Sequence, residues 1–394
     1  MISFPQALKL LTAQVPTLGV ERVHIEKCTG RILRRILTAD RDLPPYDRVM
    51  MDGHAMRAAD FVRGHDFHIV GKAPAGAAAA TLPAQANVCL EVMTGAPLPI
   101  GADCIVPIEH SEVQGDQLRV ESIYQPMALR HVHRAGSDAR RGQVLLTAGI
   151  RLGSREIGVA ASCGAAWLEV SALPRIAVVA TGDELVPVDH TPEPHQIRQS
   201  NAHAIASALR HAGQSRIRSA HLGDDEAAAQ PILQALLNDS DWLILSGAVS
   251  KGSRDFVPAL LERLGCQCLF HGIAQRPGKP AGCWQGPKGQ IIAALPGNPV
   301  SALTTLHALV LPALAAASAA TPTPARWVDA RLHSSHAIDH MTHHLPVTLG
   351  PCGTPHAAAT NTSGDFIGLL KSAGFITLPP SGDRPDRVVF TPWL

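Results

Sequence analysis

The sequence predicts a multidomain α/β protein whose largest domain has a doubly wound α/β fold. Three apolar runs of buried-strand length, at residues 177–180, 242–245 and 291–295, alternate with helix-like segments, a pattern typical of a parallel sheet. Each run is followed directly by a Gly-rich turn. At 394 residues the chain is too long for one ordinary hydrophobic core, so about two to four domains are expected.

Shifts in composition predict where the other domains lie. Apolar residues at helical spacing predict an amphipathic helix over residues 4–18. Residues 54–136 contain short Val and Ile runs separated by Gly and Pro, which predicts a small β-rich domain. The α/β domain is expected over residues 174–320. After a Pro-containing linker, strand-like runs predict a C-terminal β domain over residues 321–394.

The three Gly-rich turns are expected to converge on one crevice, because ligands of parallel sheets bind beyond the carboxyl ends of the strands. Glycines there let the backbone approach a ligand, and the amide groups that open the following helices form an anion site. Asn298 is expected to cap the last of these helices, with Pro299 as its first residue. A further helix is predicted to open at Ser200-Asn201 and to stop at Gly213. The candidate binding residues of the turns are Thr181, Gly182, Asp183, Ser246, Gly247, Ser250, Lys251, Pro296, Gly297, Asn298 and Pro299.

Carboxylates beside this anion site predict a divalent cation. Asp183, Glu184 and Asp255 supply hard oxygen ligands, and Lys251 and Lys279 supply positive charge. Because carboxylates alone would repel a phosphate, a metal ion that bridges the two is expected. The alternative is that Gly, Asp and Pro only form turns here, and their repetition at one sheet edge argues against it.

Six motifs occur in order along nearly the whole chain. They are Pro44-Pro45-Tyr46-Asp47 with Met51-Asp52-Gly53-His54-Ala55, Met93-Thr94-Gly95-Ala96-Pro97-Leu98-Pro99 with Gly101-Ala102-Asp103, Thr181-Gly182-Asp183-Glu184-Leu185, Ser246-Gly247-Ala248-Val249-Ser250, Pro277-Gly278-Lys279-Pro280 and Pro296-Gly297-Asn298-Pro299-Val300-Ser301. In this order they resemble the molybdopterin molybdenumtransferase family, the MoeA proteins and the gephyrin E domain.

The resemblance implies an elongated dimerisation domain formed by residues 1–53 and 137–173, into which the β-rich domain is inserted. It also implies that Glu184, Asp224 and Asp255 line a pterin-nucleotide crevice, and that Glu184 and Asp255 hold Mg²⁺. The implied activity is the insertion of molybdenum from molybdate into adenylylated molybdopterin, with release of AMP.

The amino-terminal motifs are similar to the opposite wall of the family's cleft. The resemblance implies that Asp52, Thr94 and Asp138 belong to that wall and are contributed across a homodimer. With Glu184 and Asp255, Asp52 and Asp138 complete the predicted catalytic set. The alternative, if the resemblance is set aside, is that the two aspartates are ordinary turn residues and Thr94 is a cap.

Two other functions are weighed against this activity. The family usually has a second glycine where this chain has Ala248, which favours a catalytically weak paralogue that acts as a pterin-binding or scaffold protein. A nucleotide hydrolase is disfavoured, because the chain has no Gly-x-x-x-x-Gly-Lys-Ser/Thr loop. The resemblance implies that an active enzyme works with a molybdopterin adenylyltransferase and with proteins that mature molybdoenzymes.

Charge and cysteine usage predict a cytoplasmic protein that binds neither nucleic acid nor membrane. The formal net charge is +1 and no run of Lys or Arg dominates any segment. The eight cysteines lack a paired spacing, which indicates reduced thiols, and no secretory signal is seen. The most apolar window, residues 302–320, is predicted to be a buried helix rather than a membrane span.

A histidine cluster follows the α/β domain. On a helix, several of these imidazoles would share one face, and His is the commonest transition-metal ligand. Because the cluster lies away from the three turns and only Asp339 accompanies it, a solvated surface is expected rather than a metal site. The cluster comprises His333, His336, His340, His343 and His344.

Overall fold

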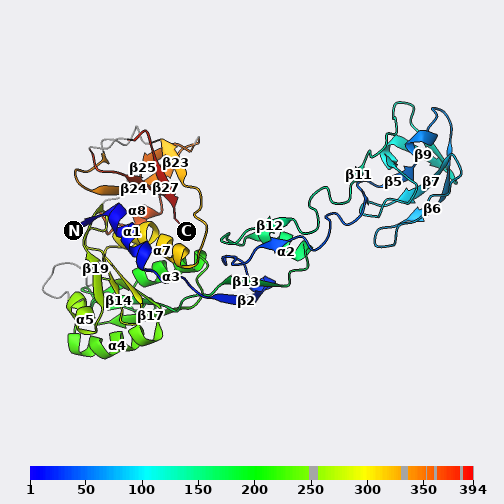
Figure 1. Cartoon of the computed structure of the whole chain (residues 1–394). Coiled ribbons are helices and arrows are strands. Elements are labelled where there is room, and N and C mark those ends of the chain that lie inside the picture. Colours follow the sequence, from blue (N-terminus) through cyan, green and yellow to red (C-terminus); the bar gives the residue numbers. More distant parts are fainter. Residues whose placement is uncertain (248–255, 330–335, 352, 359–361, 382–384, 394) are drawn as a thin grey trace. The chain divides into compact units, whose positions relative to one another are not determined.

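The computed structural model describes residues 1–393 except 248–255, 330–335, 352, 359–361 and 382–384. It divides into two compact units (Figure 1). The first unit comprises Met1–Arg35, Ala148–Ile157 and Trp167–Leu394, and the second comprises Ile36–Thr147 and Gly158–Ala166. Residues 1–53, one segment of the expected dimerisation domain, are therefore divided between the two units.

The first unit contains a mixed, mostly parallel sheet with the order β17-β14-β18-β22-β21-β19 in the described residues. The three apolar runs form β14, β18 and β22, in which every residue is buried. Strands β17, β14, β18 and β22 are parallel, and only β21 runs against its neighbours in this sheet as described. The bounds are β14 (Ile176–Thr181), β17 (Ile217–Leu222), β18 (Trp242–Ser246), β19 (Gln267–His271), β21 (Gly282–Gln285) and β22 (Ile291–Leu295).

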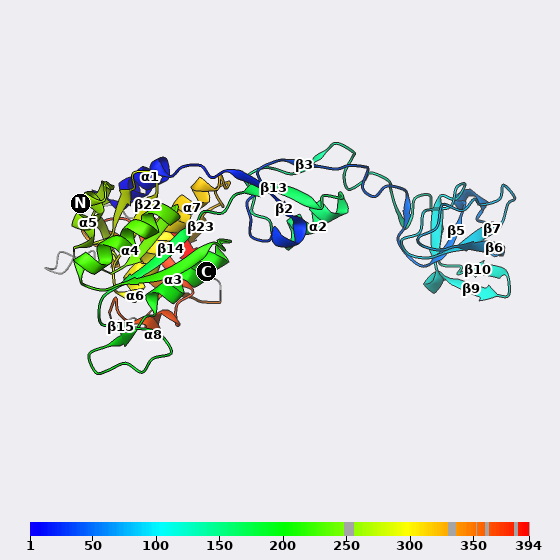
Figure 2. The same cartoon turned by 90° about the horizontal axis from the view of Figure 1, so that it is seen from below.

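Helices cover both faces of this sheet, as a doubly wound fold requires (Figure 2). Successive strand residues point to opposite faces, so Val178 packs in the core with Ile205 of α3 while Val179 packs with Leu233 of α4. Helix α3 opens at Asn201 and is followed by Gly213 at φ +84°, as predicted. The helices are α1 (Phe4–Gln14), α3 (Asn201–His211), α4 (Glu226–Asp239), α5 (Val257–Arg263), α6 (Pro299–Thr305) and α7 (Leu311–Ala317).

A second sheet of this unit combines segments from both ends of the chain. Its order in the described residues is β1-β20-β24-β26-β27-β23, with β25 paired to β24. The three strand-like runs predicted after residue 321 lie in β24, β26 and β27. The sheet comprises β1 (Ile2–Ser3), β20 (Ile273–Arg276), β23 (Arg326–Asp329), β24 (Thr342–Leu349), β25 (Pro355–Ala357), β26 (Gly374–Leu378) and β27 (Arg387–Pro392), and the short helix α8 (Phe366–Leu369) precedes β26. The unit also contains the ribbons β2 (Val20–His24) with β13 (Trp167–Ser171) and β15 (Leu185–Val186) with β16 (Ile197–Arg198).

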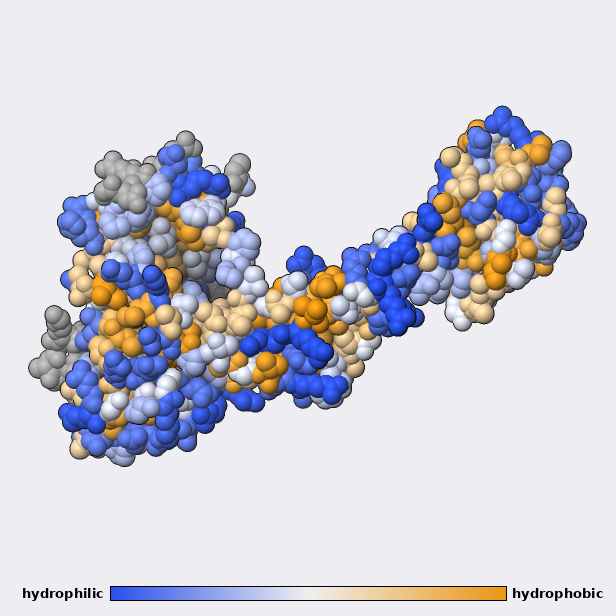
Figure 3. All heavy atoms as spheres, in the orientation of Figure 1, coloured by the Kyte–Doolittle hydropathy of each residue, from blue (hydrophilic) through white to orange (hydrophobic). Residues whose placement is uncertain are grey.

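The second unit is β-rich, as its sequence predicts. Phe67 and Leu118 are fully buried in its core, whereas Ile100, Ile123 and Met127 are exposed. Figure 3 shows hydrophobic and hydrophilic residues interspersed over the face of this unit that is in view. Its sheet has the order β8-β5-β7-β6-β10-β9, with β5 (Gly53–Met56), β6 (Phe67–Ala73), β7 (Val88–Val92), β8 (Cys104–Pro107), β9 (Ser111–Gln114) and β10 (Gln117–Val120). Two small ribbons pair β3 (Leu37–Thr38) with β12 (Val144–Leu146) and β4 (Arg48–Val49) with β11 (Val132–His133). Helix α2 (Ser154–Ser162) is divided between the two units after Ile157.

The most apolar window forms a helix of 19 residues, Pro299–Ala317, that is long and apolar enough to cross a membrane by length and composition alone. It contains α6, a π-helical turn at Leu306–Val310 and α7. In the structure 72% of the window is buried, and Leu306 and Leu309 pack against the parallel sheet. A core helix passes the same test, so the buried helix expected from the sequence accounts for this segment.

The described histidines of the cluster do not share one helix. His340 is in a turn with φ +58°, and His343 and His344 are consecutive residues of β24. His344 is fully buried between Phe4 and Phe375, so the expectation of a solvated surface is wrong for this residue. Sequence spacing suggested a shared helical face, but β pairing with β26 turned successive imidazoles to opposite sides of a strand. His333 lies outside the described residues.

We expect His344 to make folding sensitive to acid. Burial, reinforced by His343, lowers the pKa of His344 to about 3, whereas an unfolded imidazole titrates near about 6.5. The unfolded state therefore binds the proton first, and the free energy of unfolding falls as pH drops from about 6.5 towards 3, by up to about 1.4 kcal/mol per pH unit. Urea unfolding of wild type and His344→Gln between pH 7 and 4 measures this, since the variant should lose less stability on acidification.

The matched control is His356→Gln, which removes an exposed imidazole from β25 of the same sheet. It should retain the acid sensitivity of the wild type. Parallel pH profiles for wild type and His344→Gln would show that the buried imidazole is not the cause.

Candidate active site

A cavity of about 780 Å³ lies at the carboxyl ends of β14, β18 and β22. Strands β17 and β18 lie on opposite sides of β14, so the order of the strands along the sheet reverses at this point. Ligands of such sheets usually bind where the strand order reverses. Residues from all three Gly-rich turns line the cavity, as expected from the sequence. The predicted residues found in its lining are Thr181, Gly182, Glu184, Asp224, Ser246, Gly247, Pro296, Gly297, Asn298 and Pro299.

The first turn is held from two sides. The amide of Gly182 donates to the carbonyl of Leu222 at 3.1 Å, and Nε2 of His221 donates to the carbonyl of Gly182 at 2.8 Å. Gly182 has φ +128°, a conformation that side-chain-bearing residues rarely adopt. The turn therefore presents Glu184 at the cavity on a fixed backbone.

The second turn requires glycine for a steric reason. Gly247 has φ +101°, and a Cβ atom there would lie 2.4 Å from Oγ1 of Thr181. That hydroxyl donates to the carbonyl of Ser246 at 3.2 Å and so links the first two turns. The predicted residues Ser250, Lys251 and Asp255 lie outside the described residues, as does Ala248.

The third turn differs from the sequence expectation in its hydrogen bonds. Asn298 is the N-cap of α6 and Pro299 its first residue, as predicted, but the Asn298 side chain donates to Oγ of Ser363 at 2.9 Å instead of capping the helix. The amide of Val300 donates to the carbonyl of Ser363 at 3.0 Å. Because Pro299 has no N–H, the expectation of free amides along the first turn of α6 is wrong for these positions.

Asn201, the first residue of α3, connects the second and third turns. Its Nδ2 donates to Oγ of Ser246 at 2.9 Å and to the carbonyl of Gly297 at 2.6 Å. Its Oδ1 is buried and has no partner in the described residues. The side chain thus fixes the spacing of two cavity walls, and the start of α3 contributes a helix amino terminus to the cavity.

Among the described residues of the first unit, two predicted site residues lie outside the cavity lining. Asp183 is exposed, and its Oδ1 accepts the amide of Asp224 at 3.0 Å, so it shapes the neighbouring turn. Lys279 is exposed, while the adjacent Pro280 lines the cavity. Both residues were predicted because they lie near Gly-rich segments in the sequence, but neither side chain is part of the cavity lining.

The lining residues suit a cation whose coordination is completed by oxygen atoms of a bound substrate. Glu184 and Asp224 place two carboxylates in one cavity, and Mg²⁺ in proteins takes one or two carboxylates together with substrate phosphates. Among the described residues no cluster of three His, Cys, Asp or Glu forms a closed metal site. The donor set therefore suits a hard ion that needs oxygens from a bound phosphate.

Most cavity residues that the sequence did not single out for binding come from two segments. Arg198 and Gln199 lie at the end of the ribbon β15–β16, next to Ser200 and Asn201. The prediction that a helix opens at Ser200-Asn201 was a usable signal, since helix starts at this sheet edge face the crevice. Gly364 and Phe366 come from the C-terminal segment, and no local pattern points to them.

The amino-terminal site residues all lie in the second unit. The amide and hydroxyl of Thr94 donate to Oδ1 of Asp52 at 2.6 and 2.7 Å, and these bonds, the amide first, hold the pKa of the Asp52 carboxyl below its usual value. Asp138 instead pairs with Nε2 of His133 at 2.8 Å, whose Nδ1 accepts from Arg48 at 2.9 Å. The structure thus joins Asp52 to Thr94 and places Asp138 in a separate chain of contacts.

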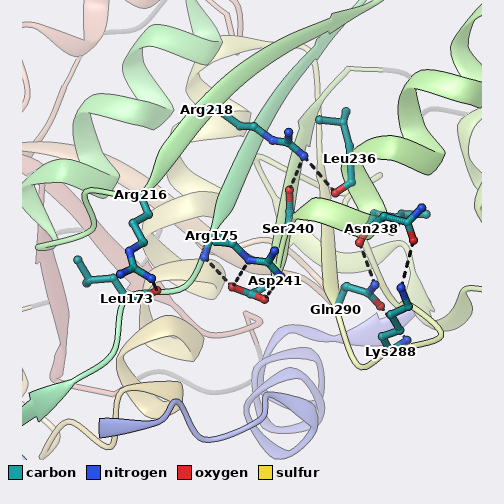
Figure 4. A network of polar contacts seen from close by, with 11 residues as sticks. Leu173, Arg175, Arg216, Arg218, Leu236, Asn238, Ser240, Asp241, Lys288 and Gln290 are labelled. Atoms are coloured by element: carbon teal, nitrogen blue, oxygen red, sulfur yellow. Dashed lines mark hydrogen bonds and ion pairs between the residues drawn. The ribbon is translucent and has the colours of Figure 1, made fainter. Parts of the chain in front are cut away.

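Charged pairs lie at the amino-terminal ends of the parallel strands, at the opposite end of the strands from the cavity (Figure 4). Arg175, just before β14, contacts Asp241, just before β18, with Nη2 to Oδ1 at 2.8 Å and its amide to Oδ2 at 2.7 Å. Arg218 of β17 donates to Oγ of Ser240 at 3.1 Å. Charges here neutralise one another across neighbouring strands, whereas the carboxyl-end turns leave polar groups facing a cavity.

Comparisons with known proteins agree with this architecture. Residues 2–164 match the model described as MoeA N-terminal region (domain I and II), and residues 177–316 match the probable molybdopterin binding domain. The molybdopterin molybdenumtransferase of Synechocystis sp. is 34% identical over 388 residues, 96% of each chain, and that of Synechococcus elongatus is 37% identical over 80% of each. The crystal structure of a molybdopterin biosynthesis MoeA protein from Pyrococcus horikosii is similar over 100% of this chain and 99% of its own, with a TM-score of 0.73 and 26% identity.

We expect Asn201→Ala to destabilise the α/β sheet by about 1–3 kcal/mol, because it removes two hydrogen bonds that each contribute about 0.5–1.5 kcal/mol. Urea unfolding followed by tryptophan fluorescence measures the loss. Asn238→Ala is the control, since Asn238 is exposed at the opposite sheet edge and makes one contact with Lys288. Equal losses in the two variants would show that Asn201 does not connect the turns.

Proposed function

Because the chain belongs to the MoeA family of molybdopterin molybdenumtransferases, enzymes of molybdenum cofactor biosynthesis, we propose that it inserts molybdenum from molybdate into adenylylated molybdopterin and releases AMP. The observation that carries this proposal is the cavity in which three Gly-rich turns and two carboxylates meet. The scaffold alternative rests on Ala248, which lies outside the described residues, and the enzyme assignment takes precedence over it.

The residues of the cavity act mainly by positioning two anionic substrates. Gly182 and Gly247 allow phosphate oxygens to approach the backbone, since neither presents a side chain. Asn201 holds the second and third turns at one spacing, so the binding groups do not have to reorganise during the reaction. Glu184 and Asp224 would hold Mg²⁺, with Asp255 a further ligand predicted from the sequence. When bound, the ion offsets the charge of phosphate and molybdate oxygens.

We expect AMP release from adenylylated molybdopterin and molybdate to require a divalent ion, and a chelator to abolish it reversibly. Glu184→Gln and Asp224→Asn should each lower kcat by at least about 100-fold, and the double variant should be little worse, because ligands of one ion act as a unit. Steady-state AMP release measures both effects.

Asp239→Asn serves as the matched control, since this exposed carboxylate lies at the opposite sheet edge and its pair with Arg218 contributes little. It should keep wild-type turnover. Mild and additive losses at Glu184 and Asp224, or turnover that survives the chelator, would contradict the shared ion.

We further propose a homodimer in which Asp52, Thr94 and Asp138 of one subunit complete the cavity of the other. The support is that the two groups of predicted residues lie in different units of the chain and that the family resemblance implies a shared cleft. The proposed setting is the cytoplasm, with no nucleic acid or membrane bound. A molybdopterin adenylyltransferase supplies the substrate, and proteins that mature molybdoenzymes receive the product.

Mixing inactive Asp52→Ala with inactive Glu184→Ala tests the shared cleft. Random subunit exchange yields about half heterodimers, each with one intact site of two, so activity should recover to roughly a quarter of wild type. AMP release after exchange measures this, with exchange verified by differently tagged subunits. No recovery in spite of verified exchange would place both residues in the site of one subunit.

A further inference from the structure

The described lining of the cavity contains two acidic side chains and one basic side chain, Arg198. Within the described part of the lining, the ionisable residues are the carboxylates Glu184 and Asp224 and one cation, Arg198. Lys279 does not line the cavity, and Lys251 lies outside the described residues. Arg198 is therefore the described side chain that can offer positive charge to an anionic substrate here.

Arg198 is held at the cavity by its own backbone and by one side-chain bond. It lies in β16, which pairs with β15 so that Arg198 is opposite Val186. Its Nε donates to the carbonyl of His190 at 3.0 Å, which fixes one edge of the guanidinium group. The side chain is thus oriented before any ligand binds, and less conformational entropy is lost on binding.

Within the described residues, the side-chain hydrogen bond of Arg198 uses Nε and leaves its two terminal nitrogens available. No described Asp or Glu lies within 4.0 Å of them, so neither Glu184 nor Asp224 neutralises the guanidinium although all three line one cavity. The amide of Ile197 donates to the carbonyl of Glu184 at 2.8 Å, so the backbone segments that carry Glu184 and Arg198 are held together beside the ribbon. A guanidinium with its fork unpaired matches the geometry of a tetrahedral oxyanion.

We propose that Arg198 is a substrate-binding residue whose guanidinium binds a tetrahedral oxyanion of the substrates, and that the ribbon β15–β16 thereby separates anion binding from the cation held at Glu184. The inference rests on the proposed function, because that function brings both a phosphate and molybdate to this cavity. Both sources share the chemistry that Arg198 recognises, and direct binding distinguishes them.

The test titrates AMP and, separately, molybdate into the full-length protein by calorimetry. Arg198→Gln should raise the Kd of the recognised anion by about 10- to 100-fold, the effect of losing charge-assisted hydrogen bonds. The Kd of Arg198→Lys should lie between those of Arg198→Gln and wild type, because an ammonium group keeps the positive charge but lacks the paired N–H donors of a guanidinium. Weaker AMP binding identifies the phosphate as the ligand, and weaker molybdate binding identifies molybdate.

Arg210→Gln is the matched control, an exposed arginine in the last turn of α3, outside the cavity lining. It should bind both anions as wild type does, and circular dichroism should show every variant folded. Unchanged affinity for both anions in Arg198→Gln would overturn the inference. If wild type binds the anions but releases no AMP from adenylylated molybdopterin, the proposed function fails while the role of Arg198 is still decided by binding.

In turnover, Arg198→Gln should raise the KM of the recognised substrate by about 10- to 100-fold and change kcat by less than about threefold, the pattern of a lost binding contact. A loss confined to kcat would contradict a binding role.

Discussion

The parallel register of β14, β18 and β22 is the constraint on which the cavity depends. Ala180 lies opposite Ser246, and Ser246 lies opposite Leu295, so the chain leaves all three strands at the same level. Helices cover both faces of the sheet, and both faces are apolar, so alternation of polar and apolar residues cannot define this register. Hydrogen bonds at the strand ends do so instead, through Thr181 and Asn201.

The helix starts around the cavity differ in whether their polar groups are used to hold the structure or are available to a ligand. The start of α6, expected to bind anions, uses Asn298 and Val300 to hold Ser363 of the C-terminal segment. At the start of α3, which also lines the cavity, the Oδ1 atom of Asn201 has no partner in the described residues. One helix amino terminus thus secures a wall, and another faces the ligand space.

Local sequence was sufficient for the strands and turns of the α/β domain. Buried strands of aliphatic residues followed by glycine are encoded within about ten residues, and β14, β18 and β22 lie where those patterns predict. Contacts between distant segments were not readable in this way. Nothing near Ile2 indicates pairing with Ile273, and nothing near Phe366 indicates a cavity wall. The direction of Lys279 depended on the turn geometry, which its own neighbours in sequence do not specify.

The pairing of β1 with β20 has a consequence for synthesis of the chain. Ile2 leaves the ribosome about 270 residues before its partner Ile273. At a translation rate of roughly 5–20 residues per second, the amino-terminal strand waits on the order of 15 to 55 s with its hydrogen-bonding groups unpaired. Helix α1, whose Leu11 is buried against the same core, waits with it. A segment made about 270 residues before its partner is therefore among the last to reach its place, and a nascent-chain chaperone has a long opportunity to bind there.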